Sequence, residues 1–228
     1  MKITFIEHSG FMVEMEHTVL LFDYYHGKIP TFDKNKMLYV FVSHSHADHY
    51  NPVIWELKEQ YEKVQYIISD DVKTKENALR MKPHEKKQIS EMTVETLKSN
   101  DIGVAYIVEV EGKVIYHAGD LNWWHWEGEE EEFNLDQAKR YQQQMQLLAD
   151  ALDGNHLDLA CIPVDPRLHS DCLRGLLAFD SRVFAKNILP IHFWGDFSVM
   201  QTLHDRLSPE LFSRILTVEH PGKICGNL

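Results

Sequence analysis

Short apolar runs that end in polar residues recur along the chain. Met37–Val42 is apolar throughout and rich in β-branched and aromatic residues, which is typical of a strand buried on both faces. Asn51 and Pro52 follow, and they predict the start of a helix, because asparagine caps helices and proline fits the first helical position. We expect this helix to span residues 52–63, with its apolar side chains on one side.

The same pattern predicts further elements on both sides of this unit. The clearest is a helix over residues 135–152, capped by Asn134, with apolar residues at helical spacing. The charged segment 70–91 is expected to form a solvated helix and loop, and two more helices are expected at 173–186 and 198–207. Strands are predicted at 3–16, 18–24, 65–69, 93–97, 103–110, 113–117, 157–163, 187–194 and 216–219.

Length and charge narrow the class of protein. The order of strands and then a helix occurs twice within 228 residues, with the division near residues 117–122, and we expect one domain, 1–228. The net charge of −12 disfavours a nucleic-acid partner, which needs a basic face. The three cysteines are widely spaced, no apolar stretch is long enough for a membrane span, and the N-terminus has no signal-peptide pattern. We therefore expect a cytoplasmic protein that acts on a small molecule; its oligomeric state does not follow.

Candidate chemistry lies directly after the buried strand. Three histidines and a carboxylate fall within six residues, at His44, His46, Asp48 and His49. Open α/β sheets place their sites at this end of a strand, and imidazole and carboxylate are ligands for divalent transition metals. A histidine-rich surface loop is the alternative, but the structural context favours a metal site.

This His-x-His-x-Asp-His segment resembles the signature of the metallo-β-lactamase superfamily of metal-dependent hydrolases. The resemblance extends to Asp23, to Gly119-Asp120 and to His192. It implies an α/β fold, the αββα sandwich, in which two sheets pack together with helices outside. The chain length and the segment His117-Ala118-Gly119-Asp120 are most similar to the small branch that includes L-ascorbate-6-phosphate lactonase.

The resemblance also implies two divalent metal ions and a set of ligands. These are His44 and His46 for the first ion, Asp48, His49 and His192 for the second, and Asp120 between them. Asp48 and Asp120 are the expected catalytic carboxylates. Two such ions hold a shared hydroxide that attacks an ester, lactone or phosphodiester bond. Zinc is the first expectation, and manganese and iron are alternatives.

The chain departs from the family at one ligand. Most members supply a third histidine to the first ion from the loop before the strand at 103–110, where this chain has Lys98-Ser99-Asn100-Asp101. We expect Asp101 to take that place, with Ser99, acting through a water, as the lesser candidate. Otherwise this is a polar turn and the first site is weak or empty. A carboxylate here shifts the metal preference towards manganese or iron.

Two carboxylates and an arginine are expected close to these ligands. Asp23 ends the strand at 18–24, and the resemblance implies that it orients a ligand histidine; an ordinary turn residue is the alternative. Asp165 follows the strand at 157–163 and is a candidate for the same task. Arg167 is a candidate contact for an anion.

Four aromatic side chains complete the candidates. His8 either faces substrate or is structural, and His117 precedes the Gly-Asp pair at a strand end. Trp123 and Trp124 follow Asp120 and are expected to shape a substrate pocket; a loop that packs over the sheet edge is the alternative.

Two other functions compete with a small-molecule hydrolase. One is a non-catalytic metal-binding or sensor module of the same fold. The other is a ribonuclease Z-like phosphodiesterase, which the acidic charge and the absence of a basic insertion disfavour. The lack of a secretion signal disfavours a true β-lactamase.

Overall fold

The computed structural model describes residues 1–228 and contains two β-sheets packed face to face. The first has seven strands in the order β13-β1-β2-β3-β4-β5-β6. They are β1 (Lys2–Glu7), β2 (Gly10–Glu14), β3 (Thr18–Phe22), β4 (Met37–Val42), β5 (Val64–Ser69), β6 (Leu79–Met81) and β13 (Ile224–Asn227). The strands from β3 to β6 run parallel, so their carboxyl ends meet at one edge.

The second sheet has six strands in the order β12-β11-β10-β9-β8-β7. They are β7 (Lys86–Ile89), β8 (Met92–Lys98), β9 (Val104–Val110), β10 (Lys113–His117), β11 (Leu159–Pro163) and β12 (Ile188–Ile191). Strands β10, β11 and β12 run parallel. Their carboxyl ends therefore also share an edge.

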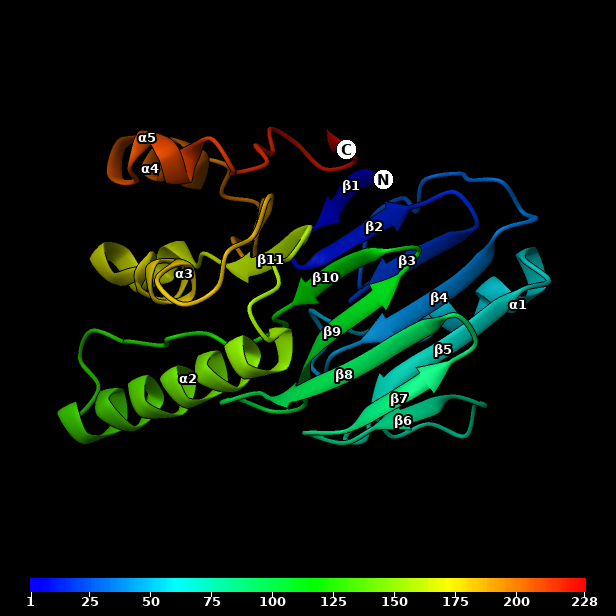
Figure 1. Ribbon diagram of the computed structural model, residues 1–228, viewed down its shortest axis with the longest axis horizontal. Helices are drawn as coiled ribbons and strands as arrows, with labels where there is room; N and C mark the ends of the chain where they lie inside the picture. Colours follow the sequence, from blue (N-terminus) through cyan, green and yellow to red (C-terminus); the bar gives the residue numbers. More distant parts are fainter.

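Helices cover the outer faces of both sheets. Figure 1 shows α2, α3, α4 and α5 on one side and α1 on the other, with the two chain ends close together. The helices are α1 (Leu57–Gln60), α2 (Glu131–Leu152), α3 (Arg174–Asp180), α4 (Val199–Arg206) and α5 (Pro209–Phe212), with 3₁₀ turns η1 (Pro52–Glu56) and η2 (Pro166–Asp171). This layered arrangement confirms the predicted αββα fold.

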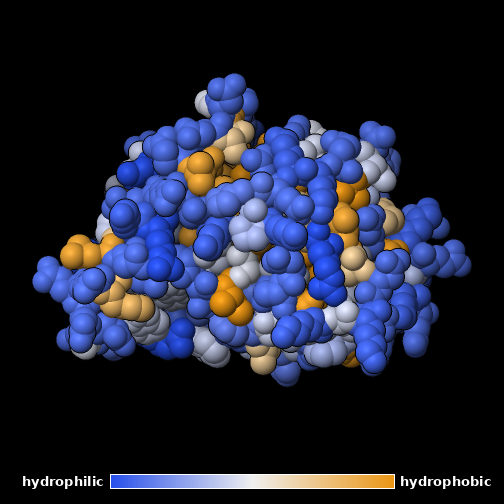
Figure 2. Space-filling view, turned by 90° about the horizontal axis from the view of Figure 1, so that it is seen from below, coloured by the Kyte–Doolittle hydropathy of each residue, from blue (hydrophilic) through white to orange (hydrophobic).

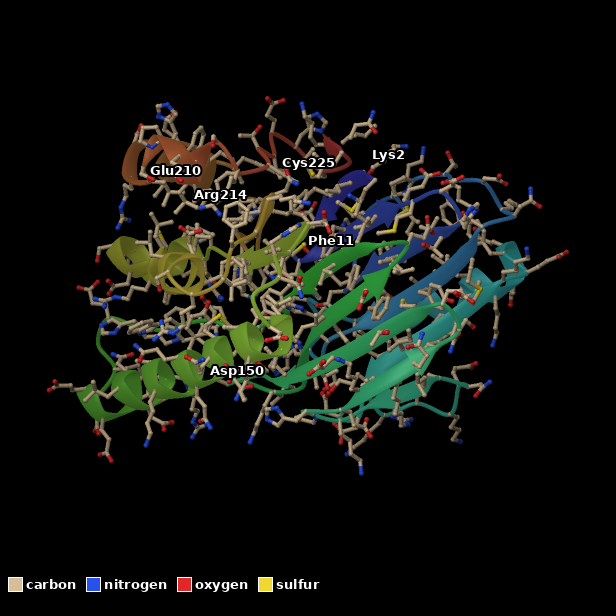
Figure 3. All side chains as sticks on the ribbon, viewed as in Figure 1. Lys2, Phe11, Asp150, Glu210, Arg214 and Cys225 are labelled. Atoms are coloured by element: carbon tan, nitrogen blue, oxygen red, sulfur yellow. The ribbon has the colours of Figure 1, made fainter.

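Apolar packing between the sheets centres on stacked aromatic rings. Phe22 stacks on Phe11 and on Phe41, with ring centroids 4.7 and 4.6 Å apart, and Phe11 is labelled near the centre of Figure 3. The other face of β4 packs under η1 and α1, where Leu38 and Val40 join a second apolar cluster. β4 is thus buried on both faces, as its uninterrupted apolar pattern predicts.

The opening segment differs from the prediction. Residues 3–16 form two strands, β1 and β2, because the chain reverses at His8 and Ser9. His8 has φ +53°, the left-handed conformation that a tight reversal requires. The segment Glu7-His8-Ser9-Gly10 interrupts the apolar pattern at this turn.

Two further predictions are wrong, and a third helix is shorter than predicted. Segment 70–91 contains the short strands β6 and β7 rather than a helix, and these strands lie at sheet edges. Residues 216–219 are not a strand, since the closing strand is β13, paired with β1. The helix predicted at 173–186 is the shorter α3.

The predicted long helix starts earlier than expected. α2 begins at Glu131, so Asn134 is not its cap but a buried residue within it that holds the backbone of Trp126. Glu131 and Glu132 lie in the first turn, where negative charge is favourable. Tyr141 and Met145 are buried, whereas Leu135, the first apolar residue of the predicted helix, is 61% exposed.

The surface shown in Figure 2 is mostly hydrophilic, with separate small apolar patches. None of the helices combines the length and apolar character that a membrane crossing requires.

Candidate metal centre

Polar residues from five strand ends meet at one edge of the two sheets. Asp23 follows β3, the segment from Ser43 to His49 follows β4, and Asp120 follows β10. Asp165 and His192 follow β11 and β12. The parallel strands of both sheets end at this edge, so the two halves of the chain build one site.

Asp120 lies between two groups of side chains that could each hold a metal ion. The first group is His44, His46, Asp101 and Asp120, and the second is His8, Asp48, His49 and His192. Oδ1 of Asp120 lies 3.0 Å from Nε2 of His49 and 3.2 Å from Nε2 of His192. Its Oδ2 lies 3.4 Å from Nε2 of His44. The structure therefore brings all seven predicted ligands together, with Asp120 in contact with histidines of both groups.

The first group includes the residue expected to replace the missing histidine. Oδ2 of Asp101 lies 3.4 Å from Nδ1 of His46, which in turn lies 3.1 Å from Nε2 of His44. Ser99, the lesser candidate, is buried, and its hydroxyl accepts a hydrogen bond from the Asp101 backbone N–H. Ser99 thus supports the turn that presents Asp101.

The distances and the unpaired atoms fit bound metal. Ligand atoms about 2.1 Å from one ion lie roughly 3.0–3.4 Å from each other in octahedral or tetrahedral coordination, which matches the separations above. Nε2 of His49 and Oδ1 of Asp120 are buried without a hydrogen-bond partner, although they are only 3.0 Å apart. Buried polar atoms normally have a partner, so both atoms are free to face a common ion.

Asp23 connects four groups beneath the centre. It is fully buried and accepts hydrogen bonds from the Ser43 N–H and hydroxyl, from Nδ1 of His49 at 2.8 Å and from Nε2 of His117 at 2.6 Å. Burial by itself raises the pKa of Asp23, but His117 and His49 outweigh it and lower the pKa below its usual range. The ionised Asp23 therefore directs Nε2 of His49 towards the centre.

Asp165 takes the same role for His192 and also binds an arginine. Its Oδ2 lies 3.0 Å from Nδ1 of His192 and accepts from Nη2 of Arg167, whose Nε donates to the same carboxylate. Arg167 reaches into the cavity between Trp126 and Trp194, with its guanidinium carbon 5.4 and 4.8 Å from the two ring centroids. Its side chain is 48% exposed. The predicted positions of Asp165 and Arg167 beside the centre agree with the structure.

Two glycines let the loops approach one another. A Cβ on Gly103 would lie 2.1 Å from the carbonyl oxygen of Ser43, and one on Gly119 would lie 2.8 Å from the Ser43 side chain. Both glycines have φ above +50°. The glycine before Asp120 is thus required by the neighbouring Ser43 loop.

A cavity of about 270 Å³ opens over both groups of ligands. Its walls include Trp124, Trp126, Trp194 and Phe133, and Arg167 is its one basic side chain apart from histidine. The indole of Trp124 lies across the His192 ring, with centroids 5.4 Å apart, and its N–H donates to the Asp120 carbonyl. The predicted position of Trp124 in the pocket wall agrees with the structure.

Trp123 is not part of this wall. It packs towards Tyr141, with ring centroids 6.4 Å apart, and lines a separate cavity under α2. The two neighbouring indoles therefore face different cavities.

His8 is closer to the centre than expected. Its imidazole is fully buried, and Nε2 lies 3.4 Å from Oδ2 of Asp48. Burial lowers the pKa of His8 to about 4, and the nearby Asp48 only partly opposes this. The sequence offered His-Ser-Gly as a turn signal, but not the direction of the imidazole.

Sequence reasoning missed two supporting residues. Ser43, which was not among the predicted site residues, places its hydroxyl 2.6 Å from Asp23 and 2.9 Å from Nδ1 of His44. Asn100 donates to the carbonyl of Asn122 and to Gln137, and so ties the Asp101 turn to the loop after Asp120. A short polar residue beside a ligand was the available signal in both cases.

Comparison with known families identifies the chain. The profile of the Beta-lactamase superfamily domain matches residues 2–136, more than half of the sequence. The chain belongs to this superfamily, and its two packed sheets form the metallo-β-lactamase fold. A comparison with curated proteins gave no match.

Solved structures share the fold at low sequence identity. A candidate metal-dependent hydrolase from Parabacteroides distasonis has a TM-score of 0.61 and 18% identity, with 95% of this chain and 93% of that one covered. Isothiocyanate hydrolase from Delia radicum gut bacteria has a TM-score of 0.58 and 12% identity, covering 98% of each chain. The short form of human tRNase Z has a TM-score of 0.53 and 12% identity, also covering 98% of each chain. At these identities the likeness concerns the fold.

Proposed function

We propose that this protein is a metal-dependent hydrolase that holds two divalent transition-metal ions and cleaves an ester, lactone or phosphodiester bond in a small molecule. The observation that carries the proposal is the meeting of two ligand groups at Asp120, on the floor of a cavity with an aromatic wall. When bound, such an ion pair supplies a nucleophilic hydroxide at neutral pH and stabilises negative charge on the substrate.

The chain's own residues orient the ligands and handle the proton. Asp23 and Asp165 fix the tautomers of His49 and His192, so that each Nε2 faces Asp120. Asp48 is partly exposed in the cavity, and we assign it the uptake of the proton released from the attacking water. Trp124 covers one side of His192 and excludes solvent there.

Zinc is the first metal that we propose for the buried imidazole-rich group. The other group contains two carboxylates, Asp101 and Asp120. This harder ligand set favours manganese or iron more than an all-imidazole site would.

The cavity supports a compact substrate with an anionic group. Three hydrogen bonds to Asp165 orient the Arg167 guanidinium from behind, while Nη1 makes no hydrogen bond within the protein. Arginine pairs well with carboxylate and phosphate groups. A small phosphorylated lactone, the substrate class suggested by the resemblance to L-ascorbate-6-phosphate lactonase, has such a group.

The test combines metal content with turnover. Protein purified without chelator should contain up to two transition-metal ions per chain by elemental analysis. The metal-loaded protein should hydrolyse at least one member of a panel of nitrophenyl esters, lactones, phosphodiesters and an isothiocyanate, the last because of the similar structure of that name. Asp120→Asn should lose metal and activity together, whereas Asp150→Asn on the outer helix α2 should keep both.

Three results would change the assignment. Stoichiometric metal without turnover on the whole panel would favour a non-catalytic sensor module. Cleavage of a tRNA precursor in preference to the small molecules would favour the tRNase Z-like alternative, against which the net charge of −12 argues. Full activity in Asp120→Asn would exclude the two-metal mechanism.

A further inference from the structure

His8 is a buried imidazole without a hydrogen-bond partner. Its exposed fraction is 0%, and neither Nδ1 nor Nε2 forms a hydrogen bond within the protein. A buried polar group in this state is costly, and native proteins rarely tolerate one without a ligand or water.

The surroundings of His8 offer metal ligands rather than hydrogen-bond partners. Nε2 lies 3.4 Å from Oδ2 of Asp48, and the ring lies 4.3 Å from that of His192 and 5.5 Å from that of His49. The ligand atoms of all four residues lie within 4.8 Å of one another. A separation of 3.4 Å is the one that two ligands about 2.1 Å from a tetrahedral ion show.

The backbone holds His8 in this position. The residue occupies the turn between β1 and β2 with φ +53°, which few residues other than glycine and asparagine adopt readily. Its carbonyl oxygen accepts a hydrogen bond from the His192 N–H at 3.1 Å. Strained conformations of this kind gather at functional sites.

We propose that Nε2 of His8 is a ligand of the second metal ion, so that this ion is held by three imidazoles and Asp48. The inference rests on the proposed metal centre. It differs from the role in substrate binding that the sequence suggested, because His8 is fully buried and does not line the cavity.

The added ligand makes the two metal sites unequal. His8, His49 and His192 are buried, whereas His46 and Asp101 in the other group are 48% and 41% exposed in their side chains. The second ion would therefore be more deeply enclosed and should exchange slowly. The first ion would lie among the more exposed ligands, where water and substrate have access, and should exchange quickly.

The experiment follows metal release from the zinc-loaded protein to a chromogenic chelator. Wild-type protein should release one ion quickly and one slowly. His8→Gly has a residue that tolerates the positive φ. This variant should release the slowly exchanging ion at least tenfold faster, and added free imidazole should return the release rate towards that of wild type. His84→Gly is the matched control, because His84 also has a positive φ, +61°, but is exposed and belongs to neither group of ligands. It should behave as wild type.

Two further measurements keep the inference testable if His8→Gly folds poorly or if His8 has a different role. His8→Asn keeps a side chain that tolerates this backbone, and circular dichroism reports its folding. In wild-type protein labelled with ¹⁵N-histidine and loaded with zinc, nuclear magnetic resonance should show metal-bound nitrogen in His8, His44, His46, His49 and His192. A spectrum in which the His8 nitrogens are unchanged by zinc would overturn the inference.

The outcomes separate this inference from the proposed function. If wild-type protein binds two ions and hydrolyses a substrate, but His8→Gly releases zinc as wild type does, only the role of His8 is wrong. If wild-type protein binds no metal, the proposed function fails as well. If His8→Gly loses the slow phase of zinc release but wild-type protein turns over no substrate, His8 is a metal ligand in a non-catalytic module.

Discussion

Oδ2 of Asp165 lies 3.0 Å from Nδ1 of His192, and the same carboxylate binds the guanidinium of Arg167. Asp165 is fully buried. Burial by itself raises its pKa, but the hydrogen bonds from His192 and Arg167 lower the pKa of Asp165 to about 2. The carboxylate is therefore ionised at neutral pH, and it links a metal-facing histidine to the arginine in the cavity.

Asp165→Asn should weaken metal binding by about 10- to 100-fold, because the amide no longer fixes the His192 tautomer by charge. Competition with a chelator of known affinity measures this change. Asp171→Asn is the matched control, since Asp171 also binds an arginine, Arg174, at 2.7 Å but lies outside the cavity. Equal affinities in Asp165→Asn and wild type would show that His192 is oriented in another way.

Arg167→Gln should weaken the binding of benzoate to the metal-loaded protein by roughly tenfold. The affinity for benzyl alcohol, which has no charge, should stay within about twofold of the wild-type value. The guanidinium would pair with the carboxylate, and the flanking rings of Trp126 and Trp194 report binding through their fluorescence. Arg174→Gln, equally exposed and also paired with an aspartate, should leave both affinities unchanged. The idea of an anion contact is wrong if benzoate binding survives the loss of Arg167 but not of Arg174.

The part of the site carried by parallel strands could be predicted from the sequence. Met37–Val42 has an apolar pattern strong enough to fix a buried strand, and the polar residues after it must then lie at the sheet edge. The same reasoning placed Asp23, Asp120 and His192 at strand ends, where the structure has them. Their roles as metal ligands stay predictions.

Features that depend on distant contacts could not be predicted. β13 pairs with β1 because the chain ends meet, and Ile224–Asn227 alone carries no strand pattern. β6 and β7 are short and partly polar, so only pairing with their neighbours defines them. His8 faces Asp48 because it occupies a left-handed turn between two apolar strands, and periodicity does not predict the direction of its imidazole.

Asp158 should stabilise the fold in a way that depends on pH. Its carboxylate accepts the Val114 N–H at 3.1 Å and pairs with Lys186 at 3.0 Å. Burial raises its pKa, but these contacts outweigh burial and lower it. A lowered folded-state pKa means that the stabilisation is present above the unfolded pKa, about 3.9, and is lost as pH falls through the folded value.

Asp158→Asn should therefore lower the free energy of unfolding at pH 7 by roughly 1 kcal/mol, and the difference from wild type should shrink as pH falls below about 4. Urea unfolding at several pH values measures it. Asp136→Asn breaks an exposed helix pair with Arg140 and should cost less than about 0.5 kcal/mol. A difference that persists unchanged at low pH would exclude the charge of Asp158 as its cause.

Asp101 offers the sharpest test of the unusual ligand set. Its Oδ2 lies 3.4 Å from Nδ1 of His46, in the position where most family members have a histidine. Asp101→Ala should weaken binding of the more exposed ion by at least tenfold and leave the ion near His49 and His192 in place, because the second group of ligands does not contain Asp101.

Asp101→His should restore binding of the first ion and shift its preference from manganese towards zinc, since imidazole is the softer ligand. Calorimetric titration of metal-free protein with each ion separately measures both affinities. Asp150→Ala removes an equal charge from the exposed face of α2 and should change neither. If Asp101→Ala binds both ions as wild type does, the carboxylate is only part of a polar turn, and the first ion must depend on His44, His46 and Asp120 alone.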